Sequence, residues 1–120
     1  MMRSTLILVA LSVLAGCSFY ARGQDDYRRA VRKVLDERNA DIEKCYRSEL
    51  ASNDKATGKV VVKFEVAPKT GEFKSTKVVK EETTANKPLQ KCVLTSLEGL
   101  KLDPADQRQG DATFAWDFSR

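Results

Sequence analysis

Three cysteines, Cys17, Cys45 and Cys92, are the residues whose types and spacing best suit covalent chemistry. A thiol can be acylated or paired in a disulfide, and a thiolate can bind a metal or attack a disulfide. The chain has no histidine, which removes His-based triads, the usual general acid or base and most metal sites. Glu81 and Glu82 are adjacent, so their carboxylates would diverge on a strand. The sequence therefore predicts no catalytic, cofactor-binding or metal-binding residue, and we expect the protein not to be an enzyme.

Residues 1–16 have the organisation of an export signal. One arginine precedes an apolar run, Thr5 to Leu14, whose ten residues fall well short of the roughly 20 that a membrane-spanning helix requires. The run leads into Leu14-Ala15-Gly16-Cys17, which resembles the lipobox of bacterial lipoproteins. This resemblance implies that residues 1–16 are a lipoprotein signal peptide and that Cys17 becomes the lipidated first residue. An ordinary secretory signal followed by a chance cysteine is the alternative.

The residues that follow Cys17 bear on location. Ser18 occupies the position at which, in the sorting rule of enteric bacteria, aspartate favours retention in the inner membrane. We therefore expect an outer-membrane lipoprotein that faces the periplasm, rather than one at the inner membrane or the cell surface. Residues 18–25 contain a glycine and no apolar periodicity, which predicts that 17–25 are the lipidated cysteine and a short tether and that 26–120 are one domain.

Cys45 and Cys92 remain as a pair in a chain expected to reach an oxidising compartment, which favours a disulfide between them. The bond would close a loop of about 48 residues, for which the chain-entropy model gives a stabilisation of about 4 kcal/mol. The alternatives are a redox-active pair or a metal-binding pair. Redox pairs usually lie two residues apart, so the wide spacing favours a structural disulfide.

Apolar spacing predicts the secondary structure. Apolar positions recur every three or four residues from Asp26 to about Leu50, which predicts an amphipathic helix, with a kink near Asn39. Strict alternation predicts a strand from Lys59 to Ala67, and a turn leads to a returning strand from Glu72 to Lys80.

The last third of the chain predicts one more helix and one more strand. Asn86 can cap a helix that has Pro88 in its first turn and an apolar stripe running to Leu100. Alternating apolar residues predict a final strand from Ala112 to Phe118. The predicted fold is α+β, with two helices packed on one face of a small three-stranded antiparallel sheet, and the disulfide would join helix to helix.

Several short motifs combine in the order expected of one known family. They are Ile42-Glu43-Lys44-Cys45-Tyr46, Gly58-Lys59-Val60, Gly71, Cys92-Val93 and a last strand that ends in Phe118. From Tyr27 to Phe118 the chain resembles the AgmX/PglI C-terminal domain, which is similar in turn to the TonB C-terminal domain. The resemblance implies a TonB-like fold and a cell-envelope interaction module that has no cofactor. It also implies docking of a periplasmic protein partner by addition of a strand to a sheet edge.

A different function remains open from the same sequence. Small size, the cysteine pair and a net charge of +4 also suit a small inhibitor or ligand-binding lipoprotein that acts on a wall component or a foreign hydrolase. Expected export argues against nucleic acid as a partner, despite the basic balance. The expected membrane contact is the lipid anchor on Cys17, and the protein partner is not identified by the sequence.

Three further patterns have a structural interpretation that we favour over a binding role. The basic cluster Arg28, Arg29, Arg32 and Lys33 is typical of a solvated helix face, although anionic headgroups are an alternative. Lysines crowd the predicted hairpin at positions 63, 69, 74, 77 and 80, which is typical of a sheet edge protected against aberrant pairing. Phe114, Trp116 and Phe118 alternate as a core face requires, although they could also line an aromatic groove.

Overall fold

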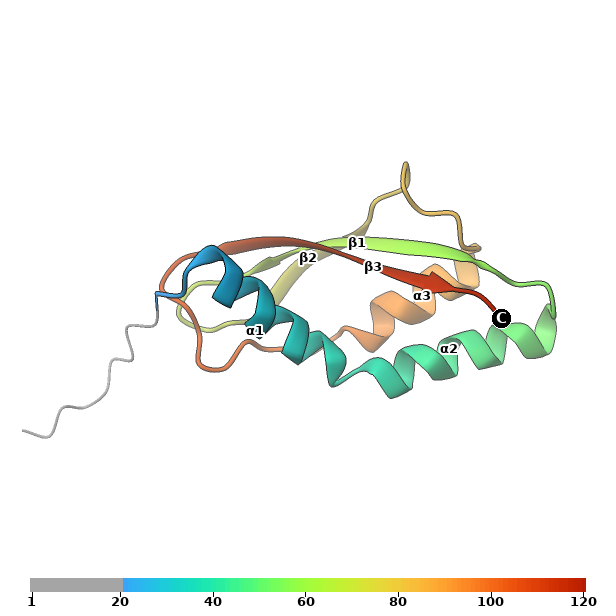
Figure 1. The fold of residues 1–120 in the computed structure, drawn as a ribbon, viewed down its shortest axis with the longest axis horizontal. Coiled ribbons are helices and arrows are strands. Elements are labelled where there is room, and N and C mark those ends of the chain that lie inside the picture. Colours follow the sequence, from blue (N-terminus) through green and yellow to red (C-terminus); the bar gives the residue numbers. More distant parts are fainter. Residues whose placement is uncertain (1–20) are drawn as a thin grey trace, which may run out of the picture.

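The structure is a computed structural model that describes residues 21–120. The predicted signal peptide and the lipidation site Cys17 lie outside the described residues. The elements are, in chain order, α1 (Gln24–Asp36), α2 (Asn39–Ser52), β1 (Gly58–Val66), β2 (Phe73–Val78), α3 (Lys87–Ser96) and β3 (Gly110–Phe118) (Figure 1).

The three strands form one antiparallel sheet in the order β2-β1-β3, so β1 is central and β2 and β3 are the edges. β3 pairs with β1 along its whole length, from Gly110 opposite Val66 to Phe118 opposite Gly58. β2 pairs only with the second half of β1, and the loop that follows it bonds to the first half through Val79 and Thr84. The α+β fold with a small antiparallel sheet is therefore confirmed.

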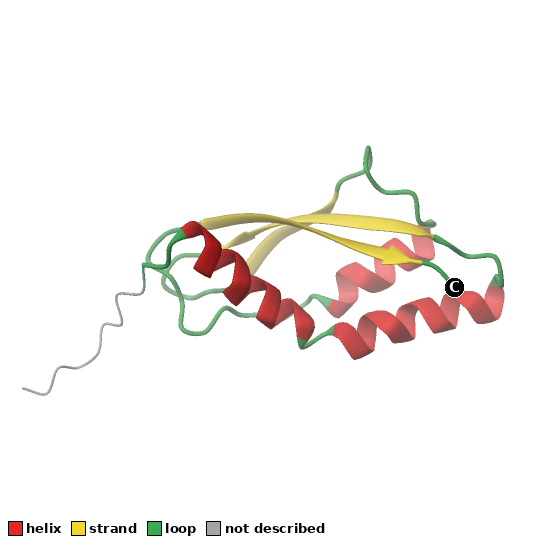
Figure 2. Ribbon diagram, in the orientation of Figure 1, coloured by secondary structure: helices red, strands yellow, loops and turns green. Residues whose placement is uncertain are grey.

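The helices lie together on one face of the sheet (Figure 2). The buried apolar side chains of the core lie between the helices and the sheet. The alternation in β1 directs Val60, Val62, Phe64 and Val66 toward the helices, and each is at most 1% exposed. Leu35 on α1, and Leu89 and Val93 on α3, meet them there. The opposite face of the sheet carries exposed side chains such as Lys63 and Thr113.

The predicted long helix is two helices, which corrects the expectation of two helices in the fold to three among the described residues. Two hydrogen bonds that each span three residues close the end of α1. The backbone N–H of Glu37 donates to the Val34 carbonyl, and that of Arg38 donates to the Leu35 carbonyl. α2 then begins at Asn39, where the sequence predicts a kink within one helix. No apolar residue lies between Leu35 and Ala40, so nothing in the core holds a continuous helix straight through this point.

α3 begins as the sequence predicts and ends earlier. The Asn86 side chain accepts a hydrogen bond of 3.0 Å from the backbone N–H of Leu89, and Pro88 lies in the first turn. The helix ends at Ser96, while Leu97 and Leu100 remain buried in the loop that follows. The expected apolar stripe is therefore present in the core, although its last turn is not helical.

Cys45 on α2 and Cys92 on α3 form a disulfide, with 5.8 Å between their Cα atoms. This bond joins helix to helix as predicted, and α2 and α3 pack against each other. Among residues 21–120 no helix is long and apolar enough to cross a membrane.

Candidate functional site

β3 is an edge strand whose outer side has no partner among residues 21–120. Its nine residues keep one unbroken register with β1, and they include no proline and no lysine. None of the described residues forms a hydrogen bond to the outward N–H and C=O groups between Asp111 and Phe118. In an antiparallel pair every second residue directs both groups away from its neighbour. β3 therefore presents a long, regular row of unpaired backbone donors and acceptors.

Aromatic side chains line the inner face of this edge. Phe118 is buried, whereas Phe114 and Trp116 pack against the core and remain partly exposed. The ring centroids of Phe114 and Trp116 lie 5.0 Å apart, and those of Tyr46 and Phe118 lie 5.2 Å apart. All three aromatic residues of β3 therefore face the core as expected, but only Phe118 is buried, and Phe114 and Trp116 leave part of their ring surface exposed beside the strand.

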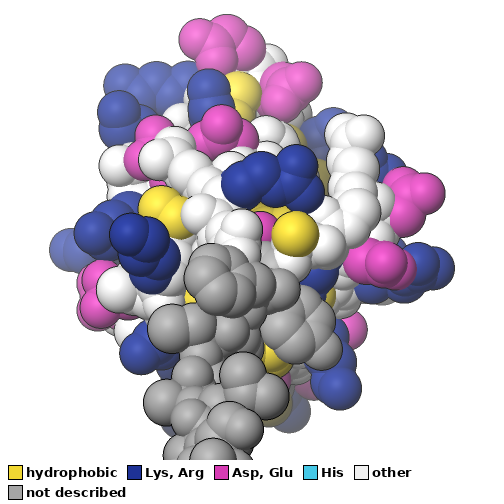
Figure 3. Space-filling view, turned by 90° about the vertical axis from the view of Figure 1, so that its left-hand side faces the viewer, with side chains coloured by type: hydrophobic (Ala, Val, Ile, Leu, Met, Phe, Trp, Pro, Cys, Tyr) yellow, Lys and Arg dark blue, Asp and Glu magenta, His cyan; other side chains and the backbone are white. Residues whose placement is uncertain are grey.

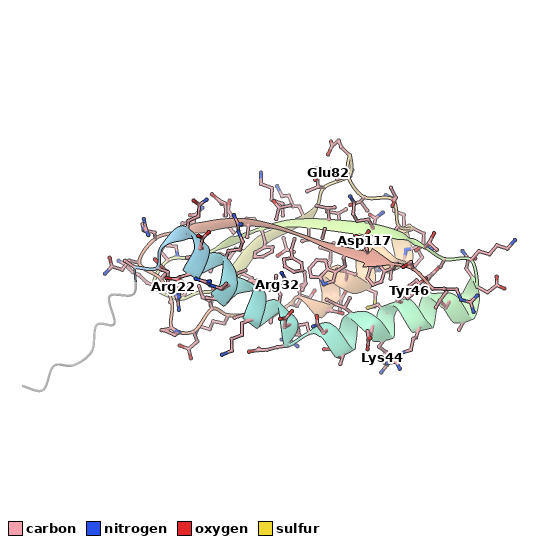
Figure 4. The ribbon with its side chains drawn as sticks, in the orientation of Figure 1. Arg22, Arg32, Lys44, Tyr46, Glu82 and Asp117 are labelled. Carbon is pink, nitrogen blue, oxygen red and sulfur yellow. A yellow bond between two sulfur atoms is a disulfide. The ribbon has the colours of Figure 1, made fainter. Side chains whose placement is uncertain are left out.

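Two cavities lie in line along β3. The larger, of about 830 Å³, lies between α1 and residues 108–114, and its apolar wall includes Tyr27, Val31 and Phe114. The smaller, of about 450 Å³, lies between α2 and residues 116–119, and its wall includes Tyr46 and Trp116. We call the pair the β3 groove. Figure 4 labels Arg32 at the first cavity, and Tyr46 and Asp117 at the second.

The two cavities differ in charge. Five arginines line the first, but Arg22 is paired with Asp106 and Arg29 with Asp26. Arg28 and Arg32 form no ion pair within residues 21–120, and the Arg32 guanidinium lies 5.9 Å from the centroid of the Phe114 ring. The remaining charges lining this cavity are those of Arg108 and one acid, Asp111. The second cavity is lined by Glu43, Arg47 and Asp117, so it carries a net negative charge.

A buried ion pair fixes the chain at the entrance to the first cavity. The side chains of Arg22 and Asp106 are only 8% and 1% exposed, and a guanidinium nitrogen lies 3.6 Å from the carboxylate. The backbone N–H of Arg22 donates to the same carboxylate at 2.9 Å, and that of Arg108 donates at 3.1 Å. The Arg22 guanidinium also donates to the Pro104 carbonyl at 2.8 Å. Arg22, which falls within the predicted tether, is therefore held on the domain.

Hydrogen bonds and charge determine the ionisation of Asp106. Burial alone would raise the pKa of this carboxyl, but the two backbone N–H donors and the charges of Arg108 and Arg22 outweigh it and lower the pKa. The carboxylate is thus ionised at neutral pH. It holds Arg22 and the 103–108 loop together.

Tyr27 lies in the wall of the first cavity, where α1 meets β3. A Cβ at Gly110 would collide with the Tyr27 ring and hydroxyl, so the glycine leaves room for this side chain in its observed position. The hydroxyl is buried and has no hydrogen-bond partner among the described residues. Burial raises the pKa of Tyr27, as do the charges of Asp106 and Asp111, although Arg22 opposes them. The phenol is therefore neutral at physiological pH.

The structure separates the predicted basic cluster. Arg28, Arg29 and Arg32 line the first cavity, whereas Lys33 does not. Helical periodicity turns Lys33 to another face of α1. The interpretation of the whole cluster as a solvated helix face is therefore incomplete, since three of its members border the groove.

The five lysines of the predicted hairpin lie in three different kinds of place. Lys74 and Lys77 lie exposed on the β2 edge, as the edge-protection interpretation expected. Lys63 lies on the central strand, where it is exposed on the open face of the sheet and is not at an edge. Lys69 and Lys80 lie in turns.

Sequence reasoning missed the residues that complete this site. Asp106 lies in a loop without periodicity, and a buried acid there leaves no pattern that could be recognised. Arg22 falls within the predicted tether, and Gly110 within a predicted loop. Tyr46 belongs to one of the motifs that carry the family resemblance, but no sequence pattern indicates that it lines a cavity. Among residues 21–120 no group of three or more His, Cys, Asp or Glu side chains is placed to hold a metal ion.

Comparison with models of protein families, with curated proteins and with solved structures found no match to this chain.

Proposed function

We propose that this protein is a non-enzymatic, lipid-anchored module of the cell envelope that docks a protein partner by adding a strand to the β3 edge. The observation that carries the proposal is the combination of an unpaired, regular edge with two cavities beside it. In strand addition, main-chain hydrogen bonds supply affinity and alternate side-chain pockets supply specificity. The β3 groove offers both features along the same nine residues.

The resemblance to the AgmX/PglI and TonB C-terminal domains supports the same proposal. It covers the chain from Tyr27 to Phe118, which includes every element that borders the groove. It suggests a partner in the periplasm and a role in assembling or coupling envelope proteins.

The proposed anchor restricts where the partner can be met. Arg22 is held by Asp106, and five chain steps separate it from Cys17. An extended chain of this length spans roughly 17 Å. A lipid on Cys17 would therefore keep the domain near its own membrane, which we propose is the outer membrane on its periplasmic side. The partner would be a protein that reaches that surface.

Amide hydrogen exchange tests strand addition directly. The mature, anchored chain in detergent micelles would be used to select strand-forming peptides from a displayed random library. We expect a bound peptide to slow exchange at alternate residues of β3 and to leave β2 unchanged. Failure to select any peptide, or protection confined to β2 or to the open face of the sheet, would contradict strand addition at β3.

Intact mass tests the anchor. Protein purified from membranes should begin at Cys17 and carry acyl chains, and two further thiols should become alkylatable only after reduction. A mass without acyl chains would overturn the anchor and the location that follows from it. Thiols that react without reduction would overturn the disulfide in the native protein.

A further inference from the structure

The charge difference along the β3 groove indicates which peptide it takes. We propose that the docked segment carries an acidic side chain in the cavity beside α1 and a bulky apolar side chain in the cavity beside α2, four residues apart along the strand. This inference rests on the proposed function, because it assigns partner chemistry to the same edge.

The acidic position follows from the arginines. Arg28 and Arg32 line the first cavity without an ion pair within residues 21–120, and Arg108 adds a third positive charge against Asp111 alone. Guanidinium groups bind carboxylates through paired, charge-assisted hydrogen bonds. Arg28 and Arg32 are exposed and therefore accessible to a carboxylate that enters the cavity. An acidic side chain is therefore the charge complement of this cavity.

The apolar position follows from the aromatic wall. Tyr46, Trp116 and Phe118 border the second cavity, and the Tyr46 hydroxyl is already engaged, donating to the Ala56 carbonyl at 2.6 Å. What remains is ring surface that a bulky apolar side chain would cover. The acids Glu43 and Asp117 at its margin disfavour a second acidic residue there. The two cavities therefore select different side chains.

The spacing follows from the strand. Ala112 and Phe114 line the first cavity, and Trp116 and Phe118 line the second, so corresponding positions differ by four residues. A strand paired with β3 advances about 3.4 Å per residue and directs every second side chain inward. Side chains four residues apart lie about 14 Å from each other on the same face, and they reach both cavities.

The charge of the surrounding surface argues against a lipid headgroup as the occupant. Figure 3 views the end of the molecule where the described chain begins, and basic side chains there are interspersed with acidic ones. Asp25 and Asp26 lie in the first turn of α1, next to the arginines. An extended anionic membrane surface would contact both basic and acidic side chains here. A single carboxylate in the cavity would contact the arginines that line it.

Trp116 gives a direct readout, because it is the only tryptophan in the chain and lines the second cavity. Eight-residue strand peptides would carry Phe at one inward position and Asp, Asn or Lys four residues away. Both orders would be synthesised, since an added strand can run in either direction. In at least one order, we expect the Asp peptide to bind the anchored, full mature chain about tenfold more tightly than the Asn peptide and the Lys peptide to bind weakest.

Matched variants locate the effect. Arg28→Gln and Arg32→Gln should each remove most of the preference for Asp over Asn. Lys44→Gln removes an equal charge from the side of α2 that is turned away from the sheet, and should retain the preference (Figure 4). The variant Arg32→Glu should instead favour the Lys peptide. Loss of the preference in Lys44→Gln would show that overall charge is responsible and would overturn the proposal.

The outcomes separate this inference from the proposed function. Equal binding of Asp and Asn peptides, with β3 amides still protected, would overturn the acidic preference and leave strand addition intact. Absence of binding by every peptide would count against strand addition itself. Sedimentation as a dimer with protected β3 amides would assign the edge to a second copy. Binding to phosphatidylglycerol vesicles that Arg28→Gln and Arg32→Gln abolish would assign the arginines to lipid. Either of these last two results would overturn the inference.

Discussion

The two edges of the sheet, β2 and β3, meet solvent in opposite ways. β2 has six residues, exposed lysines and a bulge, where Ser75 adopts a φ of 53° and the register with β1 shifts. β3 has nine residues, an unbroken register and no lysine, and two cavities lie beside it. Bulges, short length and lysines are the usual protections of a sheet edge. The contrast indicates that one edge is closed to further pairing while the other is left available.

The comparison also extends to the helices behind each edge. α3 packs against β2 and β1, whereas α1 and α2 border the cavities beside β3. The disulfide joins α2 to α3 and therefore ties the helix beside the open edge to the helix beside the closed one. The following tests separate the two edges, in order of decreasing expected effect.

Removal of the disulfide should have the largest effect on stability. The double variant Cys45→Ala with Cys92→Ala should lower the free energy of unfolding by about 4 kcal/mol, because the unfolded chain loses a long covalent loop. Urea unfolding followed by Trp116 fluorescence and by circular dichroism measures the change. The unfolding transitions followed by the two probes should still coincide, since both edges of the sheet share one core. Separate transitions would show that the edges unfold independently, and Ser48→Ala on the exposed surface of α2 serves as the control.

Loss of the buried Asp106 carboxylate should lower the free energy of unfolding slightly less than removal of the disulfide does. Asp106→Asn leaves Arg22 buried beside an uncharged amide and should lower the free energy of unfolding by about 3 kcal/mol at neutral pH. The effect should be concentrated at the end of the molecule where α1 meets β3. Asp103→Asn, an exposed change in the same loop, should be near neutral.

The same variant tests a pH dependence. The pKa of Asp106 is lowered in the folded state, so its stabilisation is present above the unfolded-state pKa of about 3.9 and is lost as the pH falls through the folded-state pKa. The wild-type free energy of unfolding should therefore fall in acid more steeply than that of Asp106→Asn. Parallel acid profiles for the two proteins would contradict the role assigned to this carboxylate.

Transfer of lysines to the open edge should remove binding with little change in stability. Thr113→Lys with Ala115→Lys places charges on exposed positions of β3, which should change stability by less than about 0.5 kcal/mol each. Affinity for a selected strand peptide should fall at least tenfold, about 1.4 kcal/mol, because the lysines oppose close approach of a second strand. Unchanged affinity in a titration followed by Trp116 fluorescence would mean that the peptide binds elsewhere.

The reciprocal change at the closed edge should have the smallest effect. Lys74→Thr with Lys77→Thr removes two exposed charges from β2 and should alter both stability and peptide affinity by less than about 0.5 kcal/mol. Light scattering at high concentration should nevertheless reveal more self-association than in the wild type, since the edge loses its protection. Peptide protection that moved to β2 would show that lysines alone distinguish the edges.

Much of the fold could be predicted because local patterns and core patterns agree. The alternation of Val60, Val62, Phe64 and Val66 identified the central strand, and Asn86 with Pro88 identified the start of α3. Periodicity could not determine that α1 and α2 are separate. The buried residues Leu35 and Ile42 are seven residues apart, which is compatible with a kinked helix or with two helices. Periodicity also could not determine that β2 would end at Val78 and contain a bulge at Ser75, because both depend on pairing with β1.

The candidate site was harder to predict for a physical reason. The alternation in β3 predicts that Phe114 and Trp116 face the helices. How much of each ring is exposed depends on how far α1 and α2 lie from β3. The groove is the space between elements that are distant in the chain. Its charged members were assigned to a solvated helix face, because a linear pattern does not reveal which side of a helix borders a cavity.

The sequence by itself determined the α+β class and the alternation in the strands, because these depend on local periodicity. It favoured the pairing of Cys45 with Cys92 once Cys17 was set aside as the expected lipidation site. Only the tertiary structure decided that β3 is an edge, that its aromatic residues line two cavities and that Arg22 is held by Asp106. Those features depend on strand order and on the gaps between packed helices. Both arise from contacts between residues far apart in the chain, which no local pattern encodes.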